Sequence, residues 1–245
     1  MKEETRRRLT DFMVEFVSRR LKTDYSIEEL HKAYPFHGLF FRDEAIIAFR
    51  RQRSIVTSMG ITFYPTLARI IAEERCSDVH VNREIVGPLS EGTLNAIGRI
   101  TSQLRARQRK PDHKSEVEEI LAARGGPERE AKMVADVFIG DLGGGPFFAE
   151  LKSYGPNLDI CAETKSKILM FCALNAGLNG EAYLALYYNP WVTRQAYAHS
   201  FTRQIMDMEA EVLIGEEFWE KVGGEGTFAE LLDIVAEVRD RTQPK

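Results

Sequence analysis

Cysteine is scarce in this sequence, and its pattern narrows the class of protein. The 245 residues contain only Cys76, Cys161 and Cys172, with no Cys-x-x-Cys pair. An odd number of widely spaced cysteines argues against a disulfide framework and against a zinc site built from paired thiolates. We therefore expect a protein of a reducing compartment, the cytoplasm.

Long apolar runs and a strong net charge are also absent. The first residues, MKEETRRRLTDF, are charged and lack a signal-peptide segment. No apolar run approaches the roughly 18 residues of a membrane span, so no membrane partner is expected. The net charge is −4. The overall basicity of many nucleic-acid binders is thus missing, although only the surface that faces the phosphates has to be positive.

Several familiar catalytic signatures are missing as well. The glycine-rich stretch GDLGGGPFFAE fits neither Gly-x₄-Gly-Lys-Ser/Thr nor Gly-x-Gly-x-x-Gly, and a strand rather than a helix is expected after it. This disfavours a nucleotide-binding loop. The five histidines form no His-Glu-x-x-His and no spaced pair, and no local signature of a serine or cysteine hydrolase is present.

The first half of the chain has the periodicity of helices. Apolar residues recur at spacings of three and four, as in Leu94, Ile97, Ile100 and Leu104. The pattern predicts helices over residues 3–22, from Ser26 to Tyr34-Pro35, over 45–50 and 65–74, and in GPLSEGTLNAIGRITSQLRAR. We therefore expect residues 1–125 to be mostly helical and to supply DNA-binding and dimerisation elements.

The period changes at Val134. Two β-type runs, residues 134–139 and 147–151, flank the glycines; a helix is expected over 160–174, and AYLALYYNP reads as a strand. This predicts an α/β (α+β) fold with a mixed central β-sheet flanked by helices. Residues 130–190 would be the catalytic sheet core and 191–245 a C-terminal helical part, within one domain spanning 1–245.

Charged residues lie inside these two strands. Glu150 and Lys152 are two apart, so they project from one face of their strand, and pairing through the glycine turn brings Asp136 to the same patch. The alternative reading is a solvated hairpin face with a cross-strand ion pair. Asp141 competes with Asp136 as the first acid, but its place beside the glycines suits a turn.

Such a group of side chains suits phosphodiester hydrolysis. Mg²⁺ prefers one or two carboxylates, waters and a phosphate oxygen, so Asp136 and Glu150 would hold the ion, with the carbonyl of Leu151 as a further ligand. Lys152 would orient the attacking water and stabilise the charged transition state. The spacing Asp-x₁₃-Glu-x-Lys is the pattern of PD-(D/E)XK nucleases.

Four further segments carry a family resemblance. FRRQRSIVTSMGITFYPTLARIIAE, ELKSYGPNLDICAETKSKIL, YYNPW and VLIGEEFWEKVGGEGTFAELLDI follow one another between about Pro35 and Ile234. Together they resemble type II restriction endonucleases of the TdeIII and EcoO109I kind. Two departures are Gln52, where the family often has Glu, and SYGPN, which lacks the family's lysine before Pro-Asn.

The resemblance implies a restriction-endonuclease-like core and makes Asp136, Glu150 and Lys152 the catalytic triplet. Arg53, Ser54 and Thr57 match its early motif. It also implies a homodimer that uses Mg²⁺ to cut double-stranded DNA at an interrupted, G·C-containing palindrome of the GGNCC type. A DNA methyltransferase encoded nearby, without a stable complex, would complete the system.

Other polar residues are candidates for contact with DNA, each with a solvated or bracing role as the alternative. A basic linker, the turn after the catalytic strand, the next helix and the segment after Tyr-Asn-Pro supply them. They are Arg105, Arg107, Arg109, Lys110, Ser153, Asn157, Lys165, Arg194 and Gln195. Glu118 and Glu119 are candidates for a further acid at or behind the metal, with a surface helix as the alternative.

Two other functions compete with restriction. A DNA repair or junction-resolving enzyme would share the PD-(D/E)XK pattern, but the Tyr-Asn-Pro and Phe-Trp segments disfavour it. A non-catalytic DNA-binding protein would need no intact Asp, Glu and Lys, and all three are present. The sequence therefore favours a site-specific endonuclease.

Overall fold

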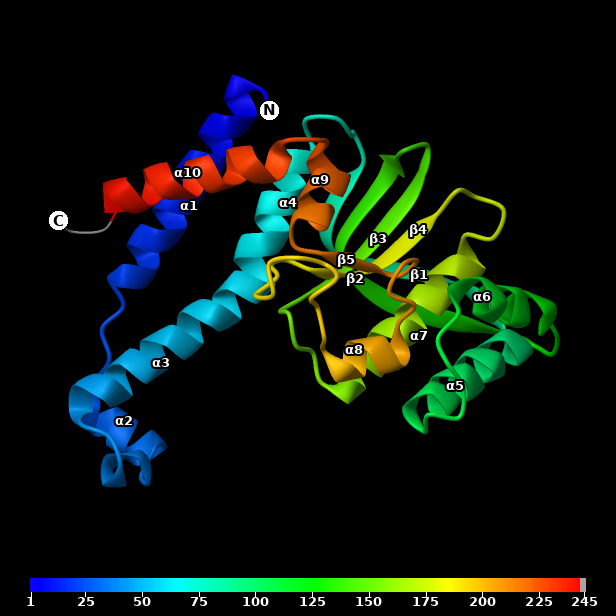
Figure 1. Cartoon of the computed structure of the whole chain (residues 1–245), viewed down its shortest axis with the longest axis horizontal. Helices are drawn as coiled ribbons and strands as arrows, with labels where there is room; N and C mark the ends of the chain where they lie inside the picture. Colours follow the sequence, from blue (N-terminus) through cyan, green and yellow to red (C-terminus); the bar gives the residue numbers. More distant parts are fainter. Residues whose placement is uncertain (243–245) are drawn as a thin grey trace.

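The predicted hairpin lies in the middle of a five-stranded sheet (Figure 1). The structure is a computed structural model and describes residues 1–242. β2 (Glu128–Leu142) and β3 (Gly145–Lys152) pair antiparallel, and Gly143 and Gly144 turn between them with φ of 65° and 88°. Both angles lie in the left-handed region that glycine adopts without steric cost. The glycine turn is thus confirmed.

The sheet is mixed, as predicted. β1 (Val79–Ser90) runs antiparallel to β2, whereas β4 (Glu181–Leu186) and β5 (Val212–Ile214) extend the other edge in parallel. The strand order is β1-β2-β3-β4-β5. α7 (Leu158–Leu174) connects β3 to β4, as a parallel pair requires a crossover.

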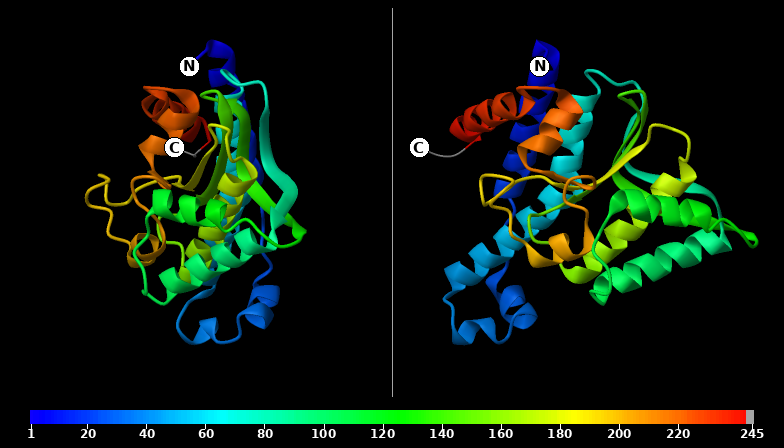
Figure 2. Two further views of the ribbon diagram at one scale, coloured as in Figure 1. Left: turned by 90° about the vertical axis from the view of Figure 1, so that its right-hand side faces the viewer. Right: turned by 45° about the vertical axis from the view of Figure 1, so that its right-hand side comes forward.

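Helices cover both faces of the sheet (Figures 1 and 2). One core contains Val137, Phe147 and Ala149 from the sheet and packs α1 (Glu3–Leu21), α4 (Tyr64–Ala72), α9 (Glu216–Gly223) and α10 (Thr227–Thr242). The other contains Phe148 and Leu184 and packs α5 (Glu91–Arg105), α6 (His113–Ala122), α7 and α8 (Ser200–Ile205).

Two strands were not predicted. β1 lies in the segment expected to be mostly helical, and the helix expected from Gly87 begins at Glu91, where the Ser90 hydroxyl caps it. β1 is an edge strand in which every second residue is half-buried or buried, and Val79, Val81, Ile85 and Leu89 occupy these positions. This period of two was available in the sequence, with Arg83 and Gly87 as its interruptions. β5 has three residues, which is too short to show a period.

One long helix replaces the two predicted over residues 45–50 and 65–74. α3 (Asp43–Ser58) continues through a π-helical turn, η2 (Met59–Phe63), into α4. The run Asp43–Ala72 is long and apolar enough by length and composition to cross a membrane. A single such helix is weak evidence for a membrane span, because a helix buried in a protein core can be equally long and apolar. In this structure α4 buries Leu67, Ala68 and Ile71.

Residues 22–58 form an arm that projects from the body (Figure 1). It consists of α2 (Ile27–Ala33), the 3₁₀ turn η1 (His37–Leu39) and α3. The predicted start of α2 is confirmed, because the Ser26 hydroxyl accepts a hydrogen bond from the Glu29 backbone N–H. Only Leu30 and Ile46 of the arm are buried.

Candidate active site

The hairpin brings the three predicted catalytic side chains together. Lys152 Nζ lies 3.2 Å from Asp136 Oδ2 and 2.8 Å from Glu150 Oε1. Glu150 is buried, whereas about a quarter of the Asp136 and Lys152 side chains remains exposed. The predicted proximity is confirmed, and a group held on two paired strands is more rigid than one held on loops.

Asp136 sits where the regular pairing of the sheet is interrupted. β2 and β3 pair from Val137 towards the turn, and beyond that point Asp136 Oδ2 accepts the backbone N–H of Leu151 at 2.7 Å. On the other side the residue opposite Asp136 in β1 is Asn82, with φ 51°. The carboxylate thus takes the place of a backbone acceptor, which fixes its position next to Glu150 and Lys152.

Three oxygens converge on one cation in this site. The Lys152 ammonium also lies 3.1 Å from the Leu151 carbonyl oxygen, so it touches all three groups predicted as magnesium ligands. Residues 1–242 contain no group of three or more His, Cys, Asp or Glu side chains that could hold a metal ion by themselves. Two carboxylates and a carbonyl, completed by water and phosphate, fit the preferences of Mg²⁺.

The charge state of Lys152 follows from its surroundings. Burial lowers the pKa of Lys152, but the negative charges of Asp136 and Glu150 and their hydrogen bonds outweigh burial, so the pKa is raised. The side chain is therefore an ammonium at neutral pH. It can donate protons in hydrogen bonds and stabilise negative charge.

Lys167 is a fourth member of the site, and sequence reasoning, which offered it only as a phosphate contact or a solvated residue, did not link it to Glu150. From α7 its Nζ lies 3.0 and 3.1 Å from the two carboxylate oxygens of Glu150, and 3.3 Å from Glu163 one turn earlier. Two carboxylates on the sheet therefore face two ammonium groups. The one available signal was that Glu163 and Lys167 share a helix face next to the catalytic strand.

Lys165 does not reach this site, and the predicted contact with DNA is wrong for the folded chain. Its side chain is fully buried, and its Nζ is paired with Glu116 and lies 2.6 Å from both carboxylate oxygens of Glu211. His113 Nδ1 lies 2.9 Å from Glu211 as well. We call Lys165, Glu116, Glu211 and His113 the buried cluster; it joins α6, α7 and the turn before β5.

The basic linker is partly committed to internal contacts. Arg109 is bound to Glu119 at 3.0 Å and lies near Glu116, so it is not a free cation in this structure, and its contact with a DNA phosphate stays a prediction. Arg105 pairs with Asp159, and Arg107 donates to Gln204, although both side chains are exposed. Lys110 is exposed too.

Arg194 is also held by internal contacts, and its role as a base reader stays a prediction. Its guanidinium donates to the carbonyls of Val212 and Met208 and to Glu217, which ties the loop after β4 to the next strand. Gln195 beside it is exposed, and Asn157 is exposed but caps α7 by accepting the Ile160 N–H. Ser153 is half-buried at the end of β3.

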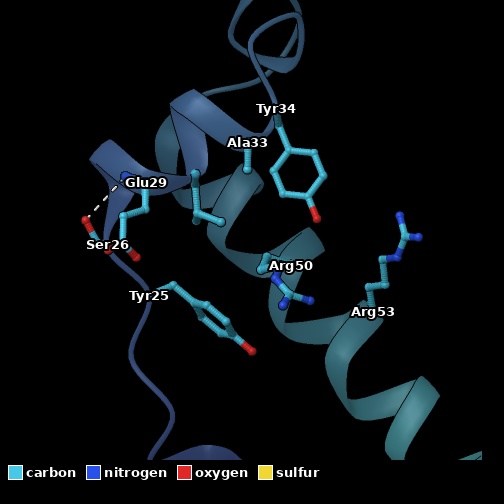
Figure 3. A pocket seen from close by; sticks show the side chains of 8 residues that line it. Tyr25, Ser26, Glu29, Ala33, Tyr34, Arg50 and Arg53 are labelled. Carbon is cyan, nitrogen blue, oxygen red and sulfur yellow. Dashed lines mark hydrogen bonds between the residues drawn. The ribbon is translucent and has the colours of Figure 1, made fainter.

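The early motif lies on the arm. Arg53 and Thr57 are exposed on α3, and Ser54 between them is half-buried. Arg53 lines a hollow of about 580 Å³ with Arg50, Tyr25, Tyr34 and Glu29 (Figure 3). This places two guanidinium groups and two aromatic rings on one surface of the arm.

Glu118 and Glu119 lie on α6 and face other partners. Glu119 pairs with Arg99 and Arg109, and Glu118 is exposed beside a hollow near Cys172. Neither makes a hydrogen bond or ion pair with Asp136, Glu150 or Lys152 among the contacts of the described residues. The predicted further acid at the metal is therefore not supplied by α6 in this structure.

Comparison with known proteins places this geometry in a class. The type II restriction enzymes HgiCII and HgiBI of Herpetosiphon aurantiacus are 28% and 27% identical to the chain, over 96% of it and 93% of their own lengths. The curated relatives and the site thus define a type II restriction endonuclease, a class of deoxyribonuclease.

The family is more specific than the class. The chain matches the family of HinfI, a type II restriction endonuclease, over residues 1–239, and it belongs to that family. The match supports the expected class of enzyme, but through the HinfI family rather than through enzymes of the TdeIII and EcoO109I kind. No solved structure matches the chain.

Proposed function

We propose that this chain is a Mg²⁺-dependent type II restriction endonuclease with a PD-(D/E)XK active site. It would hydrolyse phosphodiester bonds of double-stranded DNA at a short interrupted palindrome containing G·C pairs, of the GGNCC type. One observation carries the metal assignment: Asp136 Oδ2, Glu150 Oε1 and the Leu151 carbonyl all lie within 3.2 Å of a single ammonium. Three oxygens that surround the Lys152 ammonium in this way can also surround a metal cation such as Mg²⁺.

Each side chain then has a distinct task. Asp136, Glu150 and the Leu151 carbonyl would hold the ion, which when bound supplies Lewis-acid charge beside the scissile phosphate. Lys152 would move from these oxygens to orient the attacking water and to stabilise the extra negative charge of the transition state. Lys167 would pair with Glu150 when no ion is bound and turn to a DNA phosphate when one is.

The remaining partners follow from the reaction. A palindromic site presents the same bases to two subunits, so a homodimer places one active site on each strand. A methyltransferase encoded nearby would protect host DNA without forming a stable complex with this chain. We propose a cytoplasmic location, where that DNA is present.

The proposal is tested with purified protein, Mg²⁺ and long duplex DNA. Discrete fragments are expected, with ends that reveal the recognition sequence. Lys152→Ala should slow cleavage by about 10³-fold because it removes a charge aimed at the transition state, while Lys132→Met, which alters an exposed ion pair with Glu84, should cut normally.

Two outcomes would contradict the proposal. A continuous smear of fragments would indicate a nonspecific or repair nuclease, and DNA binding without any cleavage would indicate a non-catalytic protein. Full activity of Lys152→Ala would overturn the catalytic assignment even if discrete bands were seen.

A further inference from the structure

The tip of the arm exposes large apolar side chains. Phe36, Leu39 and Phe40 are 75%, 74% and 79% exposed, and Phe41 is 55% exposed. We call these four residues the aromatic tip. Scattered single apolar residues are normal on a protein surface, but a contiguous group of this kind marks a binding surface.

The arm has little to hold it in place within one chain. Between residues 22 and 58 only Leu30 and Ile46 are buried. The aromatic contacts of the arm are Tyr34 with His37 and Phe49, His37 with Phe41 and Phe49, and Phe40 with Phe41. Such a small core contributes little to stability. A partner that covers the tip would supply the missing burial.

A hollow lies beside the aromatic tip. It has a volume of about 520 Å³ and is lined mainly by apolar atoms of Phe41, Ala45, Ile46, Ala48 and Phe49, with His37 and Gln52. Projecting rings and a hollow able to receive a ring therefore occur on the same surface. This is the property of a self-complementary, two-fold interface, in which each copy inserts into the other.

We infer that the aromatic tip and its hollow bind a second copy of this chain. DNA fits the tip poorly, because its four exposed side chains are all apolar, and Lys32 and Arg42, which could meet phosphates, only flank it. Arg50 and Arg53 instead line a separate hollow of the arm (Figure 3). The inference rests on the proposed function in one respect: a palindromic site requires two subunits.

The exposed area agrees with a stable dimer. Aromatic side chains bury about 150–250 Å² each, so the tip offers roughly 500 Å² per chain. Val56 and Ile61 lie further along the helix that begins beside the tip, are 54% and 63% exposed, and add to this apolar area. The total approaches the ~800 Å² per partner of a standard interface.

Sedimentation equilibrium of the full chain, without DNA, tests this inference. The wild type should have twice the chain mass of 27.9 kDa, and Phe36→Asp/Phe40→Asp should have the mass of one chain. Ala48→Glu, which fills the hollow with a charge on an exposed helical position, should dissociate the dimer as well. Leu178→Asp is the matched control, because Leu178 is 62% exposed on the turn after α7, outside the arm.

A wild type of single mass, or tip variants that stay dimeric, would overturn the inference. Tip variants that keep the dimer mass but lose affinity for DNA would show that the tip binds nucleic acid instead. Circular dichroism identifies any variant that fails to fold. If Phe36→Asp/Phe40→Asp does not fold, the mass of Ala48→Glu decides whether the hollow holds the dimer together. A dimeric wild type that does not cut DNA would contradict the proposed function alone.

Discussion

Lys165 and Lys167 lie two residues apart on α7 and serve different clusters of charge. Lys165 points into the protein, where Glu116 and Glu211 surround it and solvent does not reach it. Lys167 points to the sheet, where it pairs with Glu150, the proposed metal ligand, at the margin of an accessible site. The same residue type on one helix thus contributes to stability in one position and to the site in the other.

The difference lies in what can replace each lysine. A metal ion can take the place of Lys167 beside Glu150, because about a quarter of the Asp136 and Lys152 side chains is open to solvent, and a phosphate can then become the partner of Lys167. Neither water nor an ion can take the place of Lys165, because its ammonium is paired with Glu116 and Glu211 where solvent does not reach. A paired charge that is buried is costly to break, whereas a paired charge near solvent can exchange partners.

Breaking the buried cluster should have the largest effect. Lys165→Met removes the ammonium that Glu116 and Glu211 share and leaves His113 as the charged partner of Glu211, so the free energy of unfolding should fall by about 3–5 kcal/mol, as measured by urea denaturation. Cleavage by the folded fraction should stay close to normal. Lys132→Met, in an exposed pair, is the matched control, with an expected loss below about 1 kcal/mol.

A second substitution sharpens the first. Lys165→Met/Glu116→Gln removes one of the unpaired charges and should be more stable than Lys165→Met by about 1 kcal/mol or more. Equal stability of Lys165→Met and the wild type would mean that the buried cluster does not hold α6 to α7.

Lys167→Met should change the metal affinity and the cleavage rate and leave the free energy of unfolding close to that of the wild type. Removing an ammonium that competes for Glu150 should tighten Ca²⁺ binding to the DNA-free enzyme by about fivefold or more, as measured by calorimetry, because Ca²⁺ is a similar hard cation. Loss of the phosphate contact should slow Mg²⁺-dependent cleavage by about 10²-fold, and Lys167→Arg should restore most of it. Unchanged Ca²⁺ affinity together with unchanged cleavage would contradict the exchange of partners.

His113 gives the buried cluster a dependence on pH. Its contacts with Cys172 and Glu211 raise the pKa of His113 to about 10, although burial opposes them. A raised pKa means that the charged form stabilises the fold fully below the unfolded value near 6.5, and that this stability is lost as the pH rises towards 10.

The effect of His113 should be the smallest of the three. The free energy of unfolding of the wild type should fall by about 1–2 kcal/mol between pH 7 and pH 10 through this group, less than a full conversion because the ring is partly exposed. His113→Asn should flatten the curve. Parallel curves for the two proteins would show that His113 titrates near its ordinary value.

Local pattern was sufficient to predict the hairpin that holds the proposed active site. Asp136, Glu150 and Lys152 could be assigned because they interrupt apolar strands on either side of a glycine turn, and strand alternation fixes their side. α7 was predictable from the apolar period of residues 160–174. Both signals lie within a few residues of the feature that they predict.

Other features depend on distant partners and could not be predicted. The sequence presents Lys165 and Arg194 as free cations, because only the fold brings their partners near. Lys165 pairs with Glu211, and Arg194 donates to the carbonyls of Met208 and Val212. Lys167 could be linked to Glu150 only after α7 was placed against β3. The three-residue β5 takes its form from pairing with β4, because it is too short to show a period of its own. The edge strand β1 does alternate, and it was missed although Val79, Val81, Ile85 and Leu89 mark its inner side.

The π-helical turn η2 connects the arm to α4 and bears on the direction of the arm. Each residue of an α-helix turns the chain by about 100°, whereas a π-helical turn fits one residue more into the same turn. Deleting one residue within Met59–Phe63 would therefore restore a uniform helix and leave the direction of the arm nearly unchanged. A deletion in the regular part of α3 would instead rotate the residues beyond it by about 100°, so η2 is the place in this long helix where the arm tolerates the loss of one residue.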